Sequence, residues 1–357
     1  MMKNHKTSIV QDTPLIISSK NVWIFSSWMG KKIIDNPFAF SSWVQKNKKN
    51  IRCIWIVKKK SLVHEEADIY YSLSVKGMFY QLTARVSICS HSTYSDFNPI
   101  IMLFRRSIFK VNLWHGAPLK KIMHDIETGL AQRIKKFLYD RYDLVLSPGP
   151  KFSGIFTKAF KVDSCKVIEA KYPRIKAKSI DPSFILYAPT FRDGLDFDYF
   201  KNIDFVIINK LMKKLNKVFL IRLHPSLNVS QELKNKVKIF SQIQVDETPD
   251  VYRILPYVSV LISDYSGIIF DFLYYERPII FAPFDLDEYL NKTRGVYFDY
   301  AEISIRPICY NWCEIVLCLE DIENYDYEKL RDLMIKYCCT EISPNKEIFE
   351  RIQNATY

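Results

Sequence analysis

The sequence lacks several features that would place it in a common class of protein. Only nine glycines occur in 357 residues. Their spacing forms neither Gly-x-Gly-x-x-Gly nor Gly-x-x-x-x-Gly-Lys-Ser/Thr, which excludes the classical dinucleotide fingerprint and the P-loop. No apolar run reaches the roughly 18 residues that span a bilayer. Because residues 1–7 contain neither a continuous apolar segment nor a small-residue cleavage site, we expect no secretory signal.

Paired cysteines are also missing. The eight cysteines form no Cys-x-x-Cys pair, and only six histidines are available to join them. Zinc-site spacing is therefore absent. Reduced, mostly buried thiols are the expected state, and we predict neither a cofactor nor a bound metal.

Positive charge is abundant and unevenly distributed. The net charge is +12, and residues 1–178 hold 31 lysines and arginines against 12 acidic residues, a surplus of 19. The remainder holds 20 basic and 27 acidic residues. A basic N-terminal half suits an anionic membrane surface, a polyphosphate acceptor or nucleic acid. A lysine-rich solvated surface is the simpler alternative.

Short apolar runs alternate with helical stretches along the chain, which predicts parallel strands joined by crossover helices. The expected strands are 22–25, 51–57, 86–89, 111–114, 144–146, 184–187, 218–223, 258–262 and 279–281. The expected helices are 37–47, 128–139, 199–215, 250–255, 268–275 and 326–338. Residues 171–183 are charged, contain two prolines and are interpreted as a linker. We therefore expect two Rossmann-like α/β domains, 1–174 and 175–357, facing a cleft.

The segment from 258 to 281 is a candidate phosphate site. A buried strand leads into Ser263-Asp-Tyr-Ser-Gly267 and then into a short helix. The N–H groups at a helix start bind phosphate, and ligands of open α/β sheets bind at the carboxyl ends of strands. Ser266, Gly267 and Ile268 are the expected phosphate contacts. Asp264 carries the wrong charge for this role, and we expect it to cap the helix or to hydrogen-bond an imidazole or ribose.

Two histidines occupy equivalent places in the two halves. His115 follows an expected strand and precedes Gly116, which permits close backbone approach, while His224 ends the strand Val218–Leu223. A neutral imidazole there could take a proton from an attacking hydroxyl. A structural role in the seam between domains is the alternative. Arg192, which also follows a strand, offers a planar cationic fork for phosphate, or else a surface salt bridge with Asp193.

Two Asp-x-Asp sequences, Asp196-Phe-Asp198 and Asp285-Leu-Asp287, resemble the metal signature of some nucleotide-sugar transferases. Carboxylates two residues apart are common by chance, so we predict no metal there.

Together these stretches resemble the CDP-glycerol glycerophosphotransferase family, which includes teichoic acid primases and polymerases and related capsule enzymes. The motifs that carry the resemblance are Gly30-x4-Asp35-Asn36-Pro37, Trp55, Ser74-Val-Lys-Gly77, Trp114-His-Gly-Ala-Pro-Leu-Lys120, Tyr172-Pro-Arg174, Tyr187-Ala-Pro-Thr-Phe-Arg192, Arg222-Leu-His-Pro225, Leu261-Ile-Ser-Asp-Tyr-Ser266, Arg277-Pro-Ile-Ile-Phe281, Asp285-Leu-Asp-Glu-Tyr289 and Arg294-Gly295.

The resemblance implies the two-domain GT-B architecture, with the last helix crossing back onto the first domain. It implies transfer of glycerol phosphate from CDP-glycerol to a hydroxyl on a lipid-linked or glycan acceptor, with release of CMP. His115 would be the base, with Gly116 and Lys120 on the acceptor side. His224, Arg192 and Ser266 would hold the donor phosphates, in a donor site that also includes Asp264, Tyr265, Gly267 and Ile268. Members are peripheral proteins of the cytoplasmic membrane face and need no nucleic acid.

The sequence departs from the family pattern in ways that leave the donor open. Gly267 stands where the family usually has a second serine, Lys171 replaces a glycine, and Ile305-Arg306-Pro307 replaces Pro-Gly-Pro. CDP-ribitol or another CDP-alcohol is therefore an alternative donor.

Two further classes of function are alternatives. A GT-B glycosyltransferase using a nucleotide sugar would share the fold, and a non-enzymatic binder of anionic polymers would explain the basic half. For membrane contact, Trp28, Trp43, Phe38 and Phe40 are candidates to enter an anionic leaflet, with core packing as the alternative.

Overall fold

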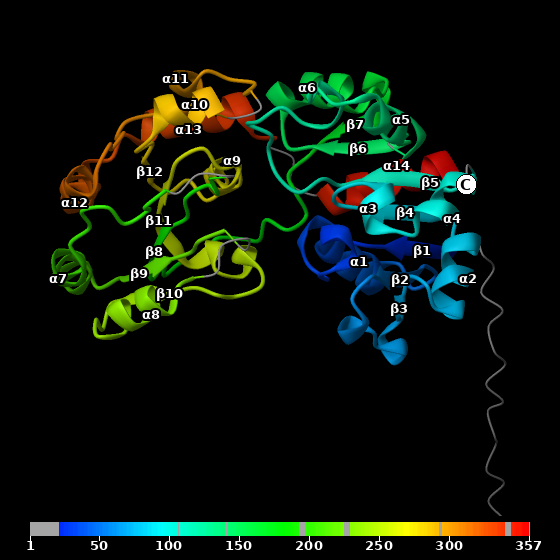
Figure 1. Ribbon diagram of the computed structural model, residues 1–357, viewed down its shortest axis with the longest axis horizontal. Coiled ribbons are helices and arrows are strands. Elements are labelled where there is room, and N and C mark those ends of the chain that lie inside the picture. The colour runs from blue at the N-terminus through cyan, green and yellow to red at the C-terminus, as the bar shows by residue number, and fades with distance from the viewer. Residues whose placement is uncertain are drawn as a thin grey trace, which may run out of the picture.

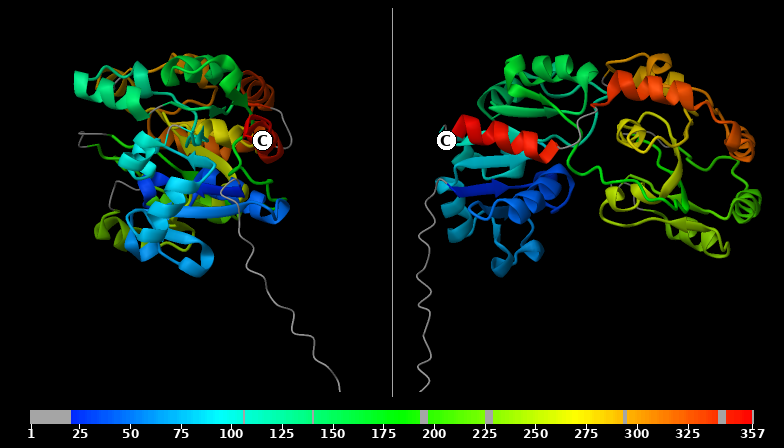
Figure 2. Two further views of the ribbon diagram at one scale, coloured as in Figure 1. Left: turned by 90° about the vertical axis from the view of Figure 1, so that its right-hand side faces the viewer. Right: turned by 180° about the vertical axis from the view of Figure 1, so that it is seen from behind.

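The protein contains two parallel β-sheets, one in each half of the chain (Figure 1). The structure is a computed structural model that describes residues 21–105, 107–139, 141–192, 197–224, 229–292, 295–339 and 344–356. Each sheet forms its own lobe, and the lobes lie next to each other (Figures 1 and 2). This arrangement confirms the expected α/β fold with two parallel sheets.

The first sheet has seven strands in the order β3-β2-β1-β4-β5-β6-β7, all parallel. These strands are β1 (Val22–Phe25), β2 (Arg52–Val57), β3 (Ile69–Tyr71), β4 (Val86–Cys89), β5 (Phe109–Asn112), β6 (Leu144–Ser147) and β7 (Val167–Glu169). Helices cover both faces, which is why the strands are almost continuously apolar. In β1, Trp23 and Phe25 pack into one core cluster, while Val22 and Ile24 pack into another.

The helices of the first half are α1 (Asp35–Asn47), α2 (Val75–Thr83), α3 (Thr93–Asp96), α4 (Pro99–Phe104), α5 (Leu130–Tyr139) and α6 (Pro150–Phe160). Several begin at a side chain that accepts a backbone N–H bond, as at Ser74, Ser92 and Asn98. Such caps satisfy donors that the first turn leaves unpaired.

The second sheet has five parallel strands in the order β10-β9-β8-β11-β12. They are β8 (Phe184–Tyr187), β9 (Val218–Ile221), β10 (Ile243–Val245), β11 (Val258–Ser263) and β12 (Ile279–Phe281). The helices of this half are α7 (Phe205–Leu215), α8 (Gln231–Lys238), α9 (Ile268–Leu273), α10 (Leu286–Lys292), α11 (Tyr300–Ile303), α12 (Trp312–Glu320) and α13 (Tyr327–Tyr337).

The last helix, α14 (Pro344–Thr356), lies on the first lobe, although it follows the second in sequence (Figure 2). It contacts α1, and the ring of Phe349 lies 5.5 Å from that of Trp23 in β1. The end of the chain is therefore anchored to the first sheet.

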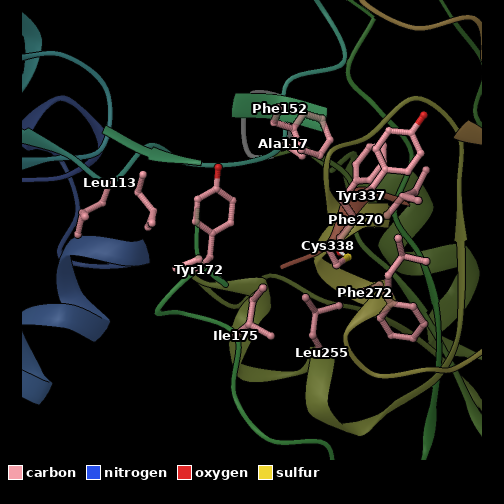
Figure 3. Close-up of a cluster of buried hydrophobic side chains, with 14 of the residues drawn as sticks. Leu113, Ala117, Phe152, Tyr172, Ile175, Leu255, Phe270, Phe272, Tyr337 and Cys338 are labelled. Carbon is pink, nitrogen blue, oxygen red and sulfur yellow. Dashed lines mark hydrogen bonds between the residues drawn. The ribbon is translucent and has the colours of Figure 1, made fainter. Parts of the chain in front are cut away.

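One hydrophobic core runs from the first lobe into the second. Phe152 of α6 lies 5.1 Å from Phe270 of α9 and 5.8 Å from Tyr337 of α13, measured between ring centroids. Tyr172, fully buried, belongs to the same cluster (Figure 3). Aromatic contacts of this kind hold the two lobes together on one side of the boundary.

Some boundaries differ from the sequence predictions. The strand expected at 111–114 is β5, at Phe109–Asn112, so His115 lies in the following loop. The helix expected at 250–255 is wrong: the region forms two 3-10 turns, Val251–Arg253 and Leu255–Tyr257, because Pro256 lacks the N–H that an α-helix would need there. The helix expected from 199 begins at Phe205, capped by Asp204.

None of the helices in the described ranges is long and apolar enough to cross a bilayer. The aromatic residues expected to touch a membrane surface are mostly placed elsewhere. Phe40 is completely buried, Trp43 packs against the core, and Trp28 lines an internal cleft. Of the four, Phe38 alone has an exposed side chain.

Candidate active site

A cleft of about 680 Å³ lies between the two lobes. Loops from both halves line it, and each of these loops follows the carboxyl end of a strand. The first lobe contributes the loops after β1, β5 and β7, and the second contributes those after β8, β9, β10 and β11. This is the edge at which open α/β sheets bind ligands.

His115 lines this cleft in the loop after β5. Its Nδ1 lies 2.7 Å from the carbonyl oxygen of Ser90. A carbonyl only accepts, so Nδ1 carries the proton and Nε2 is the basic nitrogen. Burial, and next the nearby His91, lower the pKa of His115 to about 3. The imidazole is therefore neutral at pH 7, as a proton acceptor must be.

His224 lines the same cleft from the second lobe, three residues beyond β9. Its ring stacks on Phe191, with centroids 5.4 Å apart and planes 24° apart. Burial lowers its pKa, and Lys32 and Lys120 of the first lobe lower it further. The two histidines thus share one cleft, as the sequence predicted, and Lys32 and Lys120 of the opposite lobe are close enough to His224 to act on it electrostatically.

Ser266, Gly267 and Ile268 form another wall of the cleft at the start of α9. Gly267 brings this loop against the loop of His115. A Cβ built on Gly267 would lie 2.6 Å from the backbone oxygen of Ala117. The absent side chain therefore sets how closely the loops of the two lobes approach each other.

Arg192 is buried and held by two carboxylates. Its Nη2 donates to Asp264 at 2.7 Å, and its Nε donates to Asp285, also at 2.7 Å. Nη1 donates to the carbonyl of Thr190 at 2.5 Å. Arg192 is therefore not a surface residue, and Asp193, the alternative partner considered from the sequence, lies outside the described residues. Asp264 likewise holds Arg192 and does not cap α9, whose N-cap residue is Gly267.

Tyr265 belongs to the same network. Its hydroxyl donates to Asp285 at 3.1 Å, and its ring stacks on Tyr289 at 3.8 Å. Since Asp285 already accepts bonds from Arg192 and Tyr265, its carboxylate is committed within the protein. Among the described residues, no group of three or more His, Cys, Asp or Glu side chains is placed to hold a metal ion. Asp196, of the other Asp-x-Asp sequence, lies outside those residues.

Lys120 and Gly116 lie on the first-lobe side of the cleft. The Lys120 ammonium lies 4.8 Å from the ring centroid of Tyr289, a residue of the opposite lobe. Neighbouring backbone bonds join the lobes as well: the N–H of Tyr297 donates to the carbonyl of Leu119 at 2.9 Å. Gly116 has φ +154°, a backbone conformation that side chains rarely adopt.

Sequence reasoning missed the role of Arg174. Its guanidinium donates to Asp35 of the first lobe and to Asp271 of the second, each at 2.6 Å, and also to the carbonyl of His115 at 2.9 Å. Tyr252 donates to the same Asp271. Asp35 and Arg174 both occur in motifs that signalled importance, but their pairing depends on the tertiary structure.

Comparison with known proteins identifies the family to which the sequence is similar. Residues 10–341 match the family described as CDP-Glycerol:Poly(glycerophosphate) glycerophosphotransferase. The chain is 26% identical to a teichoic acid poly(glycerol phosphate) polymerase of Bacillus spizizenii, covering 92% of this chain and 90% of that protein. It is 28% identical to a teichoic acid glycerol-phosphate transferase of Staphylococcus aureus, covering 91% and 90%.

The fold is similar to that of the wall teichoic acid polymerase TagF. The TM-score is 0.77 at 23% identity, and the match covers 94% of this chain and 89% of that chain. The likeness confirms the GT-B architecture expected from the sequence.

Proposed function

The chain belongs to the CDP-glycerol:poly(glycerophosphate) glycerophosphotransferase family and is an enzyme of that family; we propose that it transfers glycerol phosphate from CDP-glycerol to a hydroxyl of a lipid-linked or glycan acceptor, releasing CMP. The observation that carries the proposal is the shared cleft, lined by His115 of one lobe and by His224 and Ser266 of the other. The product belongs to teichoic acid or capsule biosynthesis.

In this mechanism His115 is the general base. Its Nδ1 is occupied by the carbonyl of Ser90, so Nε2 accepts the proton of the acceptor hydroxyl. The hydroxyl oxygen then attacks the β-phosphorus of CDP-glycerol, and the bond from that phosphorus to the bridging oxygen breaks. CMP leaves with the bonding electron pair. Negative phosphate beside His115 raises the affinity of the imidazole for a proton as the reaction proceeds.

The second lobe holds the donor in this proposal. Negative charge develops on the phosphoryl oxygens and on the departing CMP, and fixed cationic and N–H groups stabilise it. His224, Ser266 and the N–H groups of Gly267 and Ile268 are the proposed contacts. Arg192 acts through its pairing with Asp264, which also accepts the Thr190 N–H at 2.8 Å and so fixes the loop after β8.

The acceptor enters from the first lobe. Lys32 and Lys120 lie near His224 and supply positive charge where the two substrates meet. We propose a boundary at 174/175. Residues 1–174 form the acceptor and membrane side, and residues 175–357 bind the CDP donor, apart from the last helix α14, which packs on the first lobe. The chain then needs no metal, because its own cationic groups and N–H donors face the phosphates.

An exposed apolar surface on the first lobe is the proposed membrane contact, and it would suit a lipid-linked acceptor. It consists of exposed apolar side chains on three neighbouring helices, α2, α4 and α5, and α4 contacts both of the others. They are Val75, Met78, Phe79, Leu82, Ile100, Phe104, Leu130, Ile134 and Leu138. On α5 the residues are spaced four apart, and Arg133 of the same helix and Arg141, two residues beyond its end, are exposed. An apolar stripe with flanking cations suits the anionic cytoplasmic leaflet.

Vesicle sedimentation tests this surface. The protein is expected to sediment with phosphatidylglycerol vesicles at low salt and not with phosphatidylcholine vesicles. Replacing Phe104 and Leu130 with Asp should abolish sedimentation. Ile335→Asp is the matched control, because Ile335 is equally exposed on α13 of the second lobe. Equal binding by both variants would overturn the assignment.

A donor screen tests the reaction itself. CDP-glycerol, CDP-ribitol and UDP-N-acetylglucosamine are supplied separately with an acceptor glycan, and the released nucleotide and the product mass are measured. The proposal predicts CMP from CDP-glycerol and a product heavier by one or more glycerol phosphate units. CMP released from CDP-ribitol alone would change the donor, since Gly267 marks a departure from the family pattern. Release of UDP alone would establish a glycosyltransferase instead.

A further inference from the structure

We propose that His91 is a positioning residue for His115 and fixes the plane of the reactive imidazole; this inference rests on the proposed function. The two rings are stacked, with centroids 4.1 Å apart and planes only 9° apart. His91 follows β4, a neighbour of the β5 strand that leads to His115. His115 lines the cleft, whereas His91 is not among the described residues that line it.

His91 is itself held rigidly, which a positioning residue requires. Its backbone N–H donates to the carboxylate of Asp96 at 2.9 Å, and its carbonyl accepts from Asn112 Nδ2 at 3.0 Å. Its ring Nδ1 lies 2.9 Å from the hydroxyl of Ser90. Hydrogen bonds therefore hold both the backbone of His91 and one edge of its ring, and the ring presents a fixed flat face to His115.

Ser90, the residue before His91, sets the tautomer of His115. The Ser90 carbonyl accepts a hydrogen bond from the Nδ1–H of His115 at 2.7 Å, while the Ser90 hydroxyl lies within hydrogen-bond distance of the His91 ring. Ser90 is positioned in turn, because its own N–H donates to Asp96 at 3.0 Å. One short segment thus sets both the plane of the base and the nitrogen that remains basic. Off-plane rotation of His115 would break the Ser90 bond and misdirect Nε2.

The charges around the pair suit a ring that gains a proton. Burial lowers the pKa of His91 to about 4, so this ring is uncharged at neutral pH and adds no repulsion when His115 is protonated. The charged groups that face His115 are Asp35, Arg174 and, behind the histidine pair, Asp96. A second cationic ring at position 91 would oppose the reaction; a neutral flat ring does not.

The test compares three variants in the full chain. His91→Ala removes the stacked ring, and His91→Phe keeps a flat ring without the ring nitrogens. Ser90→Ala removes the hydroxyl that contacts His91 and that also accepts the Trp28 N–H at 3.2 Å. We expect His91→Ala to lower kcat for CMP release by about 10- to 100-fold, with KM for CDP-glycerol unchanged within about twofold. His91→Phe should recover most of the loss, and Ser90→Ala should fall between the two. Equal kcat values for His91→Ala and wild type would overturn the proposal.

A second readout does not depend on activity. Nitrogen-15 NMR of the histidine rings distinguishes an imidazole protonated on Nδ1 from one protonated on Nε2. Wild type and His91→Phe are expected to hold His115 in the Nδ1–H form, and His91→Ala should give a mixture. If wild type releases no CMP from CDP-glycerol, the proposed function fails, and the ring spectra still decide whether His91 positions His115. An unchanged His115 spectrum in folded His91→Ala would refute positioning.

Discussion

The guanidinium of Arg174 donates to the carboxylate of Asp271 at 2.6 Å, across the boundary between the two lobes. Its other terminal nitrogen donates to Asp35 at the start of α1, also at 2.6 Å. All three side chains are buried. Arg174 thus links the two lobes through buried ion pairs at the cleft. It also donates a hydrogen bond to the carbonyl of His115, the proposed base.

Removing the Arg174 guanidinium should lower the free energy of unfolding. Arg174→Met leaves the carboxylates of Asp35 and Asp271 buried without their cation, and breaking a buried pair in this way costs about 3–5 kcal/mol. Urea unfolding should show that loss. Lys76→Met is the matched control, because Lys76 pairs with Glu65 in solvent, where such a pair contributes about 0–1 kcal/mol. Equal stability losses in the two variants would contradict the assigned role.

Gly267 should be intolerant of a side chain. In Gly267→Ser the new Cβ meets the Ala117 backbone oxygen at 2.6 Å, so the two loops must separate. Misplacement by about 1 Å can cost on the order of 10²-fold in rate, and we expect a loss of that order in kcat/KM for CDP-glycerol. Gly154→Ser on α6 is the control, since its Cβ meets no atom within 4 Å. A Gly267→Ser enzyme with wild-type kcat/KM would show that the close approach is dispensable.

Stability should fall on acidification because two neutral histidines are partly buried at the cleft and directly behind it. Burial lowers the folded-state pKa values of His115 and His91 to about 3 and about 4, from 6.5. The unfolded chain therefore binds these protons first, and unfolding free energy declines below about pH 6.5. Each proton contributes up to about 1.4 kcal/mol per pH unit.

Asp96 acts in the opposite direction. Burial raises the folded-state pKa of Asp96 from 3.8 to about 6. Between these pH values the folded state binds the proton more tightly, so protonation of Asp96 stabilises the fold as the pH falls. This gain offsets the stability lost through about one of the two histidines. Urea titrations of wild type and His91→Phe at pH 7 and pH 5 measure the balance. His91→Phe should lose less stability than wild type between the two pH values. A greater loss in the variant would refute the neutral state of His91 in the folded protein.

Sequence reasoning located four strands at their observed bounds. The bounds of β1, β4, β8 and β12 agree with the predicted ranges because these segments are short, largely apolar runs in which nearly every residue is buried. The predicted range for β5 began two residues too late, because the strand includes Lys110, a charged residue that is nevertheless buried in the sheet. The three-residue strands β3, β7 and β10 were missed because only one residue of each is buried, which leaves a weak apolar pattern. The edge strand β12 is equally short, but all three of its residues are apolar and buried.

The sequence allowed the residues of the cleft to be predicted where they directly follow a strand. His115, His224 and Ser266 each follow a strand, and the topology places such loops at one edge. The partners of Arg192 could not be read from the chain, because Asp264 and Asp285 are more than 70 residues away from it. The stacking of His91 on His115 likewise requires β4 and β5 to be adjacent, which only the fold establishes.

The most direct test of the account replaces the proposed base. His115→Asn is compared with wild type and with His64→Asn, a control at an exposed histidine, by measuring CMP release and, by calorimetry, CDP-glycerol binding. The account predicts that His115→Asn binds CDP-glycerol with a Kd within about twofold of wild type but loses about 10²–10⁴ in kcat, while the control is unchanged. CMP release by His115→Asn at the wild-type rate would contradict it.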